Sequence, residues 1–165
     1  CALPISYTER FCSCSYSFST MSKNSQDEFV PKNPQKLVGN ARPFYRSSWE
    51  LTFMQFCDNN PSVHQWASES VKIPYKDPLT GKNTIYVPDF LICYLDKHQK
   101  KHVEVVEIKP KKQSLIESRT ASAKDKLAVV INHAKWAAAN AYCKRFGYTF
   151  RVITENDLFI NGRSK

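Results

Sequence analysis

Hydrophobic and polar positions alternate most clearly in two apolar segments that flank the charged turn LDKHQKKH at residues 95–102. Alternation with a period of two residues predicts β-strands, and the short turn between them predicts an antiparallel hairpin. One face of the first strand carries Ile85, Val87, Asp89 and Leu91. One face of the second strand carries Val103, Val105, Glu107 and Lys109. Each strand therefore has an acidic residue at a position where a core residue is expected.

Pairing of these two strands would place Asp89 beside Glu107, with Lys109 on the same face. A buried, isolated carboxylate costs several kcal/mol, so two adjacent ones need a cation, a shared proton or an ion pair. Lys109 neutralises one charge, and a divalent cation held by both acids and by substrate phosphate oxygens would neutralise the rest. Two carboxylates, a metal and a lysine are the minimum for metal-assisted phosphodiester hydrolysis. The alternative is an exposed hairpin whose two acids are simply solvated.

The segment SSWELTFMQFCDNN predicts a helix that begins at Ser47 or Ser48 and ends at Asn59-Asn60-Pro61. Glu50 shares a helix face with the apolar residues at positions 53, 54 and 57. We therefore expect Glu50 to be a third acid of the metal site, binding directly or through water. The alternative is a first-turn glutamate that is stabilised by the helix dipole. Arg46, just before the helix, is expected to contact a phosphate or to pair with Glu50.

The rest of the chain predicts further strands and one long helix. A strand is expected within residues 69–77, followed by a turn at Pro78 and Gly81. Pro88 would kink the next strand and so aim the side chain of Asp89. The long helix is predicted over Ala123–Phe146, with Gly147 as its C-cap, and a last strand over Tyr148–Ile153. Its apolar positions, expected to pack on the sheet, are Leu127, Val130, Ile131, Ala134, Ala138 and Ala141.

Composition and charge favour a polyanionic partner. The chain has 165 residues with 24 Lys+Arg against 15 Asp+Glu, a net charge of +9, and nucleic acid is the commonest partner of so basic a protein. Lys111 and Lys112 follow Lys109 closely and are expected to contact DNA phosphates, the alternative being solvated charge. No run of about 18 apolar residues is present, so no membrane partner is expected.

Three segments differ in character. Residues 1–20 are rich in Ser and Cys without periodicity, and we expect a non-native read-through upstream of Met21 or a disordered extension. Residues 21–45 contain Pro31, Pro34, Pro43 and several basic residues, which predicts an extended basic arm. Residues 46–165 would form the folded domain.

The motifs VPDF at 87–90 and VEIK at 106–109 resemble the signature of the PD-(D/E)xK nuclease superfamily. This resemblance implies a restriction-endonuclease-like α/β (α+β) fold, with an αβββαβ core in which helices flank a central mixed sheet. It also implies that Glu50, Asp89, Glu107 and Lys109 are the catalytic residues. Glu50, Asp89 and Glu107 would bind Mg²⁺, for which Mn²⁺ can substitute.

Further motifs narrow the resemblance. YRSSWE at 45–50, WASESVKIPY at 66–75 and KWAAANAYCKRFGYTFRVITEND at 135–157 resemble the head completion nucleases of large contractile-tailed bacteriophages. This implies an endonuclease and exonuclease of packaged double-stranded DNA that acts in head completion and head–tail joining. Its partners would be head, portal or neck proteins, in the virion and, during assembly, in the host cytoplasm. The order of elements also resembles the transposon end-cleaving endonuclease subunit. The alternatives are therefore a transposon- or junction-type endonuclease and a non-catalytic DNA-binding connector or plug.

Overall fold

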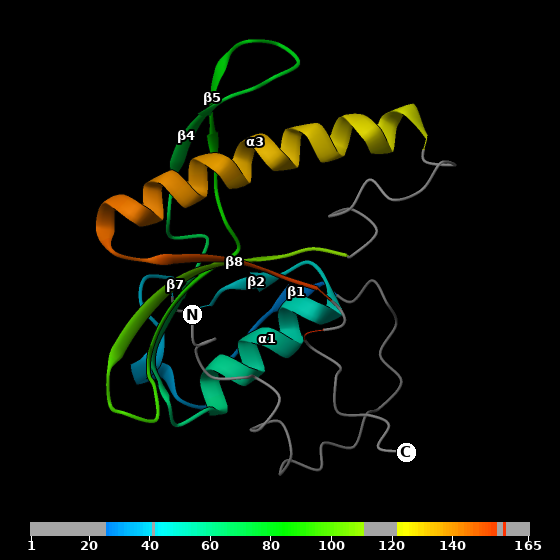
Figure 1. Ribbon diagram of the computed structural model, residues 1–165. Helices are drawn as coiled ribbons and strands as arrows, with labels where there is room; N and C mark the ends of the chain where they lie inside the picture. The colour runs from blue at the N-terminus through cyan, green and yellow to red at the C-terminus, as the bar shows by residue number, and fades with distance from the viewer. Residues whose placement is uncertain (1–25, 41, 111–121, 155–156, 158–165) are drawn as a thin grey trace, which may run out of the picture.

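A central sheet of four strands, in the order β3-β6-β7-β8, carries the fold (Figure 1). The computed structural model describes residues 26–40, 42–110, 122–154 and 157. The strands are β3 (Val63–Ser68), β6 (Phe90–Leu95), β7 (Lys101–Ile108) and β8 (Thr149–Ile153). The first three are antiparallel, and β8 runs parallel to β7. Helices α1 (Ser48–Asn59) and α3 (Ala123–Phe146) cover opposite faces of the sheet. This mixed sheet flanked by helices confirms the predicted restriction-endonuclease-like fold.

Helix α1 has the bounds that the sequence predicts. Ser47 is the N-cap, and its hydroxyl accepts a hydrogen bond of 3.2 Å from the backbone nitrogen of Glu50. The predicted apolar face is buried against the sheet through Phe53, Met54 and Cys57. This face and the strands form the main core, which contains large aromatic residues such as Trp66 and Phe90. Burial of this face, more than helix propensity, stabilises a helix of this length.

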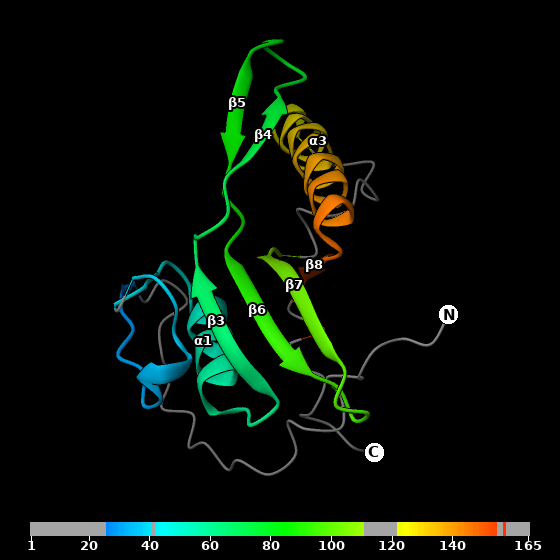
Figure 2. The ribbon, with the colours of Figure 1, turned by 90° about the vertical axis from the view of Figure 1, so that its left-hand side faces the viewer.

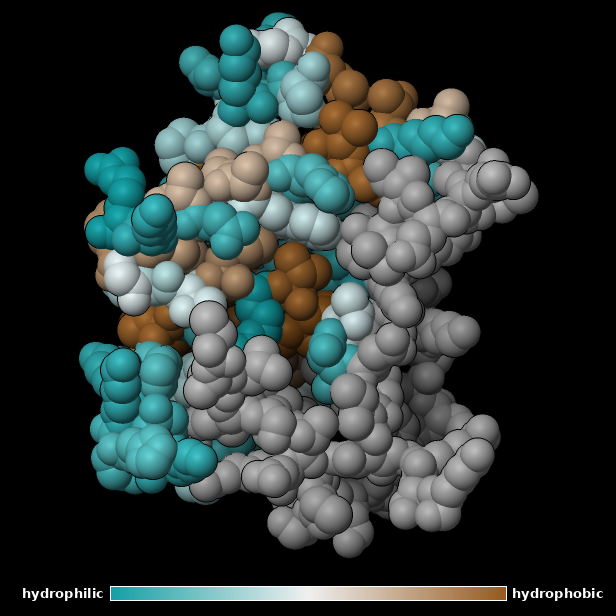
Figure 3. All heavy atoms as spheres, in the orientation of Figure 1, coloured by the Kyte–Doolittle hydropathy of each residue, from teal (hydrophilic) through white to brown (hydrophobic). Residues whose placement is uncertain are grey.

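Helix α3 also has its predicted bounds, but the face expected to pack is partly wrong. The helix begins with a capping box between Ser122 and Asp125 and ends at Gly147, whose φ of 69° is the left-handed conformation that favours glycine. Leu127 and Val130 are 47% and 42% exposed, and hydrophobic residues are visible over this part of the surface (Figure 3). The helix instead buries Val129, Ala139 and Cys143. No helix in the described part of the chain is long and apolar enough to span a membrane.

A separate two-stranded hairpin projects beyond the central sheet (Figure 2). It consists of β4 (Ile73–Lys76) and β5 (Asn83–Tyr86). The strand predicted within residues 69–77 therefore belongs to this hairpin, and the first strand of the central sheet is β3, which the sequence pattern missed. Residues 87–89 separate β5 from β6, so the predicted strand from Ile85 onward is two strands. Ile85 is 53% exposed because it lies on the outward face of the hairpin.

The described part of the segment expected to be an extended arm packs on the domain. Strand β1 (Asp27–Glu28) pairs with β2 (Phe44–Tyr45), and a short 3-10 helix, η2 (Pro34–Lys36), lies between them. Phe29 and Tyr45 are buried in the main core. Phe29 makes an edge-to-face contact with Trp66, with the ring centroids 5.8 Å apart. Aromatic contacts of this kind hold the segment against the sheet.

The C-terminal end of α1 anchors the same segment. The carboxylate of Asp58 accepts hydrogen bonds from the backbone nitrogens of Lys32, at 2.8 Å, and Asn33, at 3.0 Å. The Lys36 ammonium donates to the backbone carbonyls of Asp58, at 3.0 Å, and Asn60, at 2.8 Å. Carbonyls at a helix end lack partners within the helix, so a lysine in this position stabilises them. Lys36 therefore caps α1 and is not part of an extended arm.

Candidate active site

The carboxylates of Asp89 and Glu107 come together where β6 and β7 meet, as the strand pairing predicts. Phe90, the first residue of β6, is paired with Val106, so Asp89, which directly precedes β6, lies opposite Glu107. Oδ2 of Asp89 accepts a hydrogen bond of 2.7 Å from the backbone nitrogen of Ile108. Burial, and after it the negative charge of Glu107, raise the pKa of Asp89 to about 7 against the lowering effect of the hydrogen bond from Ile108.

Glu107 is buried and has a different partner on each oxygen. Its side chain is 5% exposed, and Oε1 lies 3.1 Å from the Lys109 ammonium. Oε2 accepts a hydrogen bond of 2.8 Å from the Tyr86 hydroxyl. Tyr86 was not expected from the sequence, although its position three residues before Asp89 could have suggested a polar tip near the acids. Lys109 directly follows β7, and its side chain, which contacts Glu107, is partly exposed.

Glu50 lies near the carboxylate pair but has a capping role of its own. Its Oε2 accepts a hydrogen bond of 2.9 Å from the Arg46 backbone nitrogen, and its Oε1 accepts one of 3.0 Å from the Ser47 hydroxyl. The negative charge of Glu50 contributes to the raised pKa of Asp89, which places the two side chains within electrostatic range. Among the described residues, no three His, Cys, Asp or Glu side chains converge closely enough to hold a metal ion. The structure therefore shows two facing carboxylates, with Glu50 at longer range.

Arg46 adds a cation at the same edge of the sheet. Its guanidinium lies 2.6 Å from Oε1 of Glu69, and the two side chains are 53% and 44% exposed. The hydrogen bond that Arg46 donates to Glu69 raises the pKa of Arg46, and the charges of Glu69, Glu50 and Asp89 also raise it. The backbone nitrogen of Glu69 donates to the carbonyl of Asp89 at 2.9 Å, which ties the end of β3 to the site. Lys111 and Lys112 lie outside the described residues.

The donor set fits a hard divalent cation. Two carboxylates face each other, and a raised pKa of Asp89 shows that their charge is only partly compensated. In the portion of the chain that the structure describes, Oδ1 of Asp89 has no hydrogen-bond partner, while Oδ2 is bonded to Ile108. Mg²⁺ is bound in proteins by one or two carboxylates together with water and substrate phosphates. Asp89 and Glu107 supply two such carboxylates.

Comparison with known proteins identifies the class of protein to which this site belongs. Residues 60–155 match the TnsA-like endonuclease N-terminal family, and the matched region contains Asp89, Glu107 and Lys109. The chain therefore belongs to this endonuclease family. It is also similar to the head completion nuclease of Enterobacteria phage T4, with 33% identity over 141 residues that cover 79% of this chain and 91% of that protein. The resemblances to the head completion nucleases and to the transposon end-cleaving endonuclease subunit are thus confirmed.

Proposed function

We propose that this protein is a Mg²⁺-dependent deoxyribonuclease, with Mn²⁺ able to substitute, that hydrolyses phosphodiester bonds of packaged double-stranded DNA. Its cleavage is endonucleolytic and exonucleolytic, and it serves phage head completion and head–tail joining. The observation that carries this proposal is the pairing of the partly buried Asp89 with the buried Glu107, with Lys109 beside them, in a chain of an endonuclease family. The similarity to the T4 head completion nuclease supports the proposed role in phage head completion.

Each residue of the site has a defined part in the proposed reaction. Asp89 and Glu107 would hold the metal, with Glu50 acting through water. When bound, the metal would polarise the scissile phosphate and lower the pKa of a water molecule. The Lys109 ammonium forms an ion pair with Glu107, at 3.1 Å, and so lies at the edge of the carboxylate pair. From there Lys109 stabilises negative charge that develops on the phosphate or on the attacking water.

Duplex DNA would approach across a basic surface. An exposed ion pair such as Arg46–Glu69 contributes only about 0–1 kcal/mol, so Arg46 can leave Glu69 for a phosphate at little cost. Lys111 and Lys112, which follow Lys109 in the sequence, supply further phosphate contacts in this proposal.

The place where the protein acts is inferred from its similarity to the T4 head completion nuclease. By similarity to a head completion nuclease, the protein would act on phage heads in the host cytoplasm during assembly and remain in the virion. Head, portal or neck proteins would be its partners there. Co-sedimentation of the purified protein with DNA-filled, tailless heads tests this, and recovery only in the unbound fraction would contradict it.

A plasmid-nicking assay tests the catalytic proposal. The parent should convert supercoiled plasmid to nicked and linear forms with Mg²⁺ or Mn²⁺ and should leave it intact with EDTA. Glu107→Gln should lose cleavage. Glu104→Gln is the matched control, because Glu104 is another buried glutamate of β7. A folded parent that binds DNA but cuts none with either metal would instead support the non-catalytic plug.

A further inference from the structure

Tyr86 contacts the carboxylate pair, and Lys135 of helix α3 lies over the ring of Tyr86. Tyr86, the last residue of β5, is buried and bonds through its hydroxyl to Oε2 of Glu107. The ammonium of Lys135, from α3, lies over the Tyr86 ring, 5.7 Å from its centroid. We propose that Tyr86 is a positioning residue for Glu107 and that Lys135 is a further phosphate-binding residue of the same site. This inference rests on the proposed function and names two residues that the sequence patterns did not single out.

The surroundings of Tyr86 hold its hydroxyl in one place. Tyr86 is paired with Ile73 across the hairpin, and its ring packs in a cluster with Val71, Ile73 and Ala139. A buried ring fixed on several sides leaves its hydroxyl little freedom to move. The bond to Oε2 of Glu107, with Lys109 on Oε1, therefore fixes the rotation of the carboxylate about its long axis. Residues that orient a metal-binding carboxylate in this way affect metal affinity or activity by about 10–100-fold.

The charge of Lys135 is uncompensated in the described structure. Lys124, Lys126 and Lys144 of the same helix are exposed, whereas Lys135 is half-buried. Its ammonium rests on the face of an aromatic ring, an arrangement that attracts a cation without neutralising it. Among the described residues, Lys135 forms no ion pair and no hydrogen bond through its side chain. A cation held beside a site for phosphodiesters, and not occupied by an acid, suits a phosphate oxygen of the substrate.

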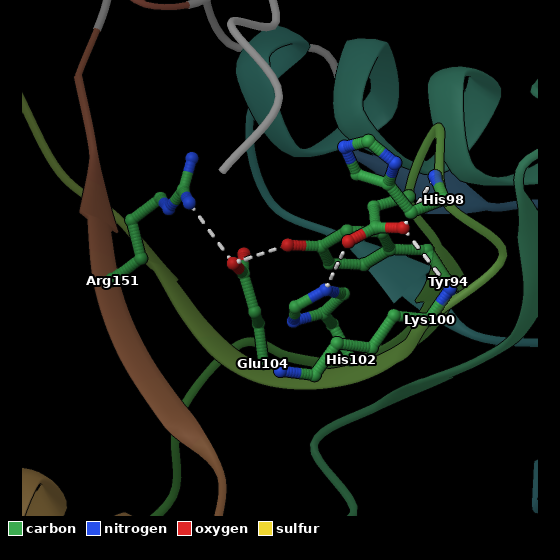
Figure 4. Close-up of polar contacts among 7 residues, drawn as sticks. Tyr94, His98, Lys100, His102, Glu104 and Arg151 are labelled. Atoms are coloured by element: carbon green, nitrogen blue, oxygen red, sulfur yellow. Dashed lines mark hydrogen bonds and ion pairs between the residues drawn. The ribbon is translucent and has the colours of Figure 1, made fainter. Parts of the chain in front are cut away.

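A second tyrosine–glutamate pair, between β6 and β7, provides a matched control (Figure 4). The Tyr94 hydroxyl donates to Oε1 of Glu104 at 2.8 Å, the same distance as in the Tyr86–Glu107 pair. Arg151 also donates to that oxygen at 2.9 Å. Glu104 and Glu107 are an odd number of residues apart on β7, so their side chains project from opposite faces of the strand. Tyr94 therefore offers the same chemistry away from the proposed active site.

The role of Tyr86 is tested with Tyr86→Phe against Tyr94→Phe. In Tyr86→Phe, we expect single-turnover cleavage at saturating protein to fall at least about 10-fold and the Mn²⁺ dissociation constant, measured by calorimetry without DNA, to rise. Binding to duplex DNA in EDTA should stay at the parent level, because the hydroxyl faces Glu107 and not the phosphates. Tyr94→Phe should change neither cleavage nor Mn²⁺ affinity. Parent-level cleavage and Mn²⁺ affinity in Tyr86→Phe would overturn the positioning role, whatever its melting temperature.

The role of Lys135 is tested by binding alone. Fluorescence anisotropy with a duplex in EDTA, across a salt series, should show that Lys135→Gln reduces the slope of log K against log salt concentration by about 0.9, the value for one lost phosphate contact. Lys97→Gln, in the turn between β6 and β7 at the other end of these strands, should keep the parent slope. A parent slope in Lys135→Gln would overturn the phosphate contact. A parent that binds DNA but never cuts it would overturn the proposed function alone, because Mn²⁺ affinity and the salt slope still test these two residues.

Discussion

The backbone nitrogen of Ile108 donates a hydrogen bond of 2.7 Å to the side chain of Asp89, across the strands that carry the carboxylate pair. Phe90 and Val106 are the last paired residues at this end of the ladder, so the carboxylate of Asp89 takes the position of a backbone acceptor. The bond holds Asp89 opposite Glu107 even though their charges repel. Repulsion and burial then raise the pKa of Asp89 to about 7, with burial the larger cause.

This raised pKa predicts how stability depends on pH without metal. Below about pH 4, Asp89 is protonated in both the folded and the unfolded state and has no effect. Between about pH 4 and 7, the unfolded chain loses this proton while the folded protein keeps it, so the free energy of unfolding falls as pH rises. The loss amounts to at most roughly 4 kcal/mol, at about 1.4 kcal/mol for each pKa unit, and is complete above pH 7.

Asp89→Asn isolates this contribution. We expect urea denaturation in EDTA to show a smaller decrease in the free energy of unfolding between pH 5 and pH 8 for Asp89→Asn than for the parent. Other carboxylates titrate in both proteins and cancel in the comparison. Equal pH dependence of the two proteins would show that Asp89 ionises in the folded state as easily as in the unfolded one.

At neutral pH, the same substitution and Glu107→Gln separate catalysis from folding. Each removes one of two repelling charges while keeping the shape of the side chain. Both variants should lose Mg²⁺-dependent cleavage, and in EDTA both should melt at the parent temperature or somewhat higher. Circular dichroism and a cleavage time course are the measurements. Parent-level cleavage by either variant would remove that residue from the site.

Lys109→Ala should separate binding from chemistry. The ammonium contacts Glu107 and is only partly exposed, so it serves the reacting phosphate more than the DNA backbone at large. We expect near-normal duplex binding by fluorescence anisotropy and single-turnover cleavage slower by about 100-fold, the scale of one well-placed electrostatic group. Lys101→Ala, at the other end of β7, is the control. If binding and cleavage fall in equal proportion in Lys109→Ala, the lysine only holds DNA.

The sequence predicted those elements whose patterns are local. Both ends of α1 and α3 carry capping residues, and the acids stand out because they interrupt apolar strands. Strand β3 was missed because its register shifts between Val63 and Gln65, which breaks the alternation of buried and exposed positions. The alternation from Ile85 to Leu91 continues in the sequence although the chain leaves one sheet and enters another at residues 87–89. Alternation alone does not show which sheet a strand joins.

The residues of the site also differ in how far local sequence patterns predict their positions. Asp89, Glu107 and Lys109 belong to one hairpin, so strand pairing alone brings them together. Tyr86 and Lys135 reach the site only because the β4–β5 hairpin and α3 pack on each other, which depends on contacts between distant segments. The hydrogen bonds from residues 32 and 33 to Asp58 depend on tertiary packing in the same way, and the basic composition of that segment suggested a free arm instead.

Removing the buried carboxylate of Asp58 should lower the stability of the fold without changing catalysis. Asp58 is fully buried and accepts backbone hydrogen bonds from Lys32 and Asn33. Asp58→Ala would leave two partly buried backbone N–H groups without their acceptor, and bonds to a charged group contribute about 1.5–3 kcal/mol each. We expect the free energy of unfolding, from urea denaturation, to fall by about 2–4 kcal/mol.

Asp77→Ala is the matched control, since Asp77 accepts backbone hydrogen bonds in an exposed turn and its replacement should cost under about 1 kcal/mol. Cleavage by the folded fraction should be unchanged, because Asp58 lies at the end of α1 opposite to Glu50. Equal losses of stability in the two variants would show that Asp58 does not anchor the N-terminal segment.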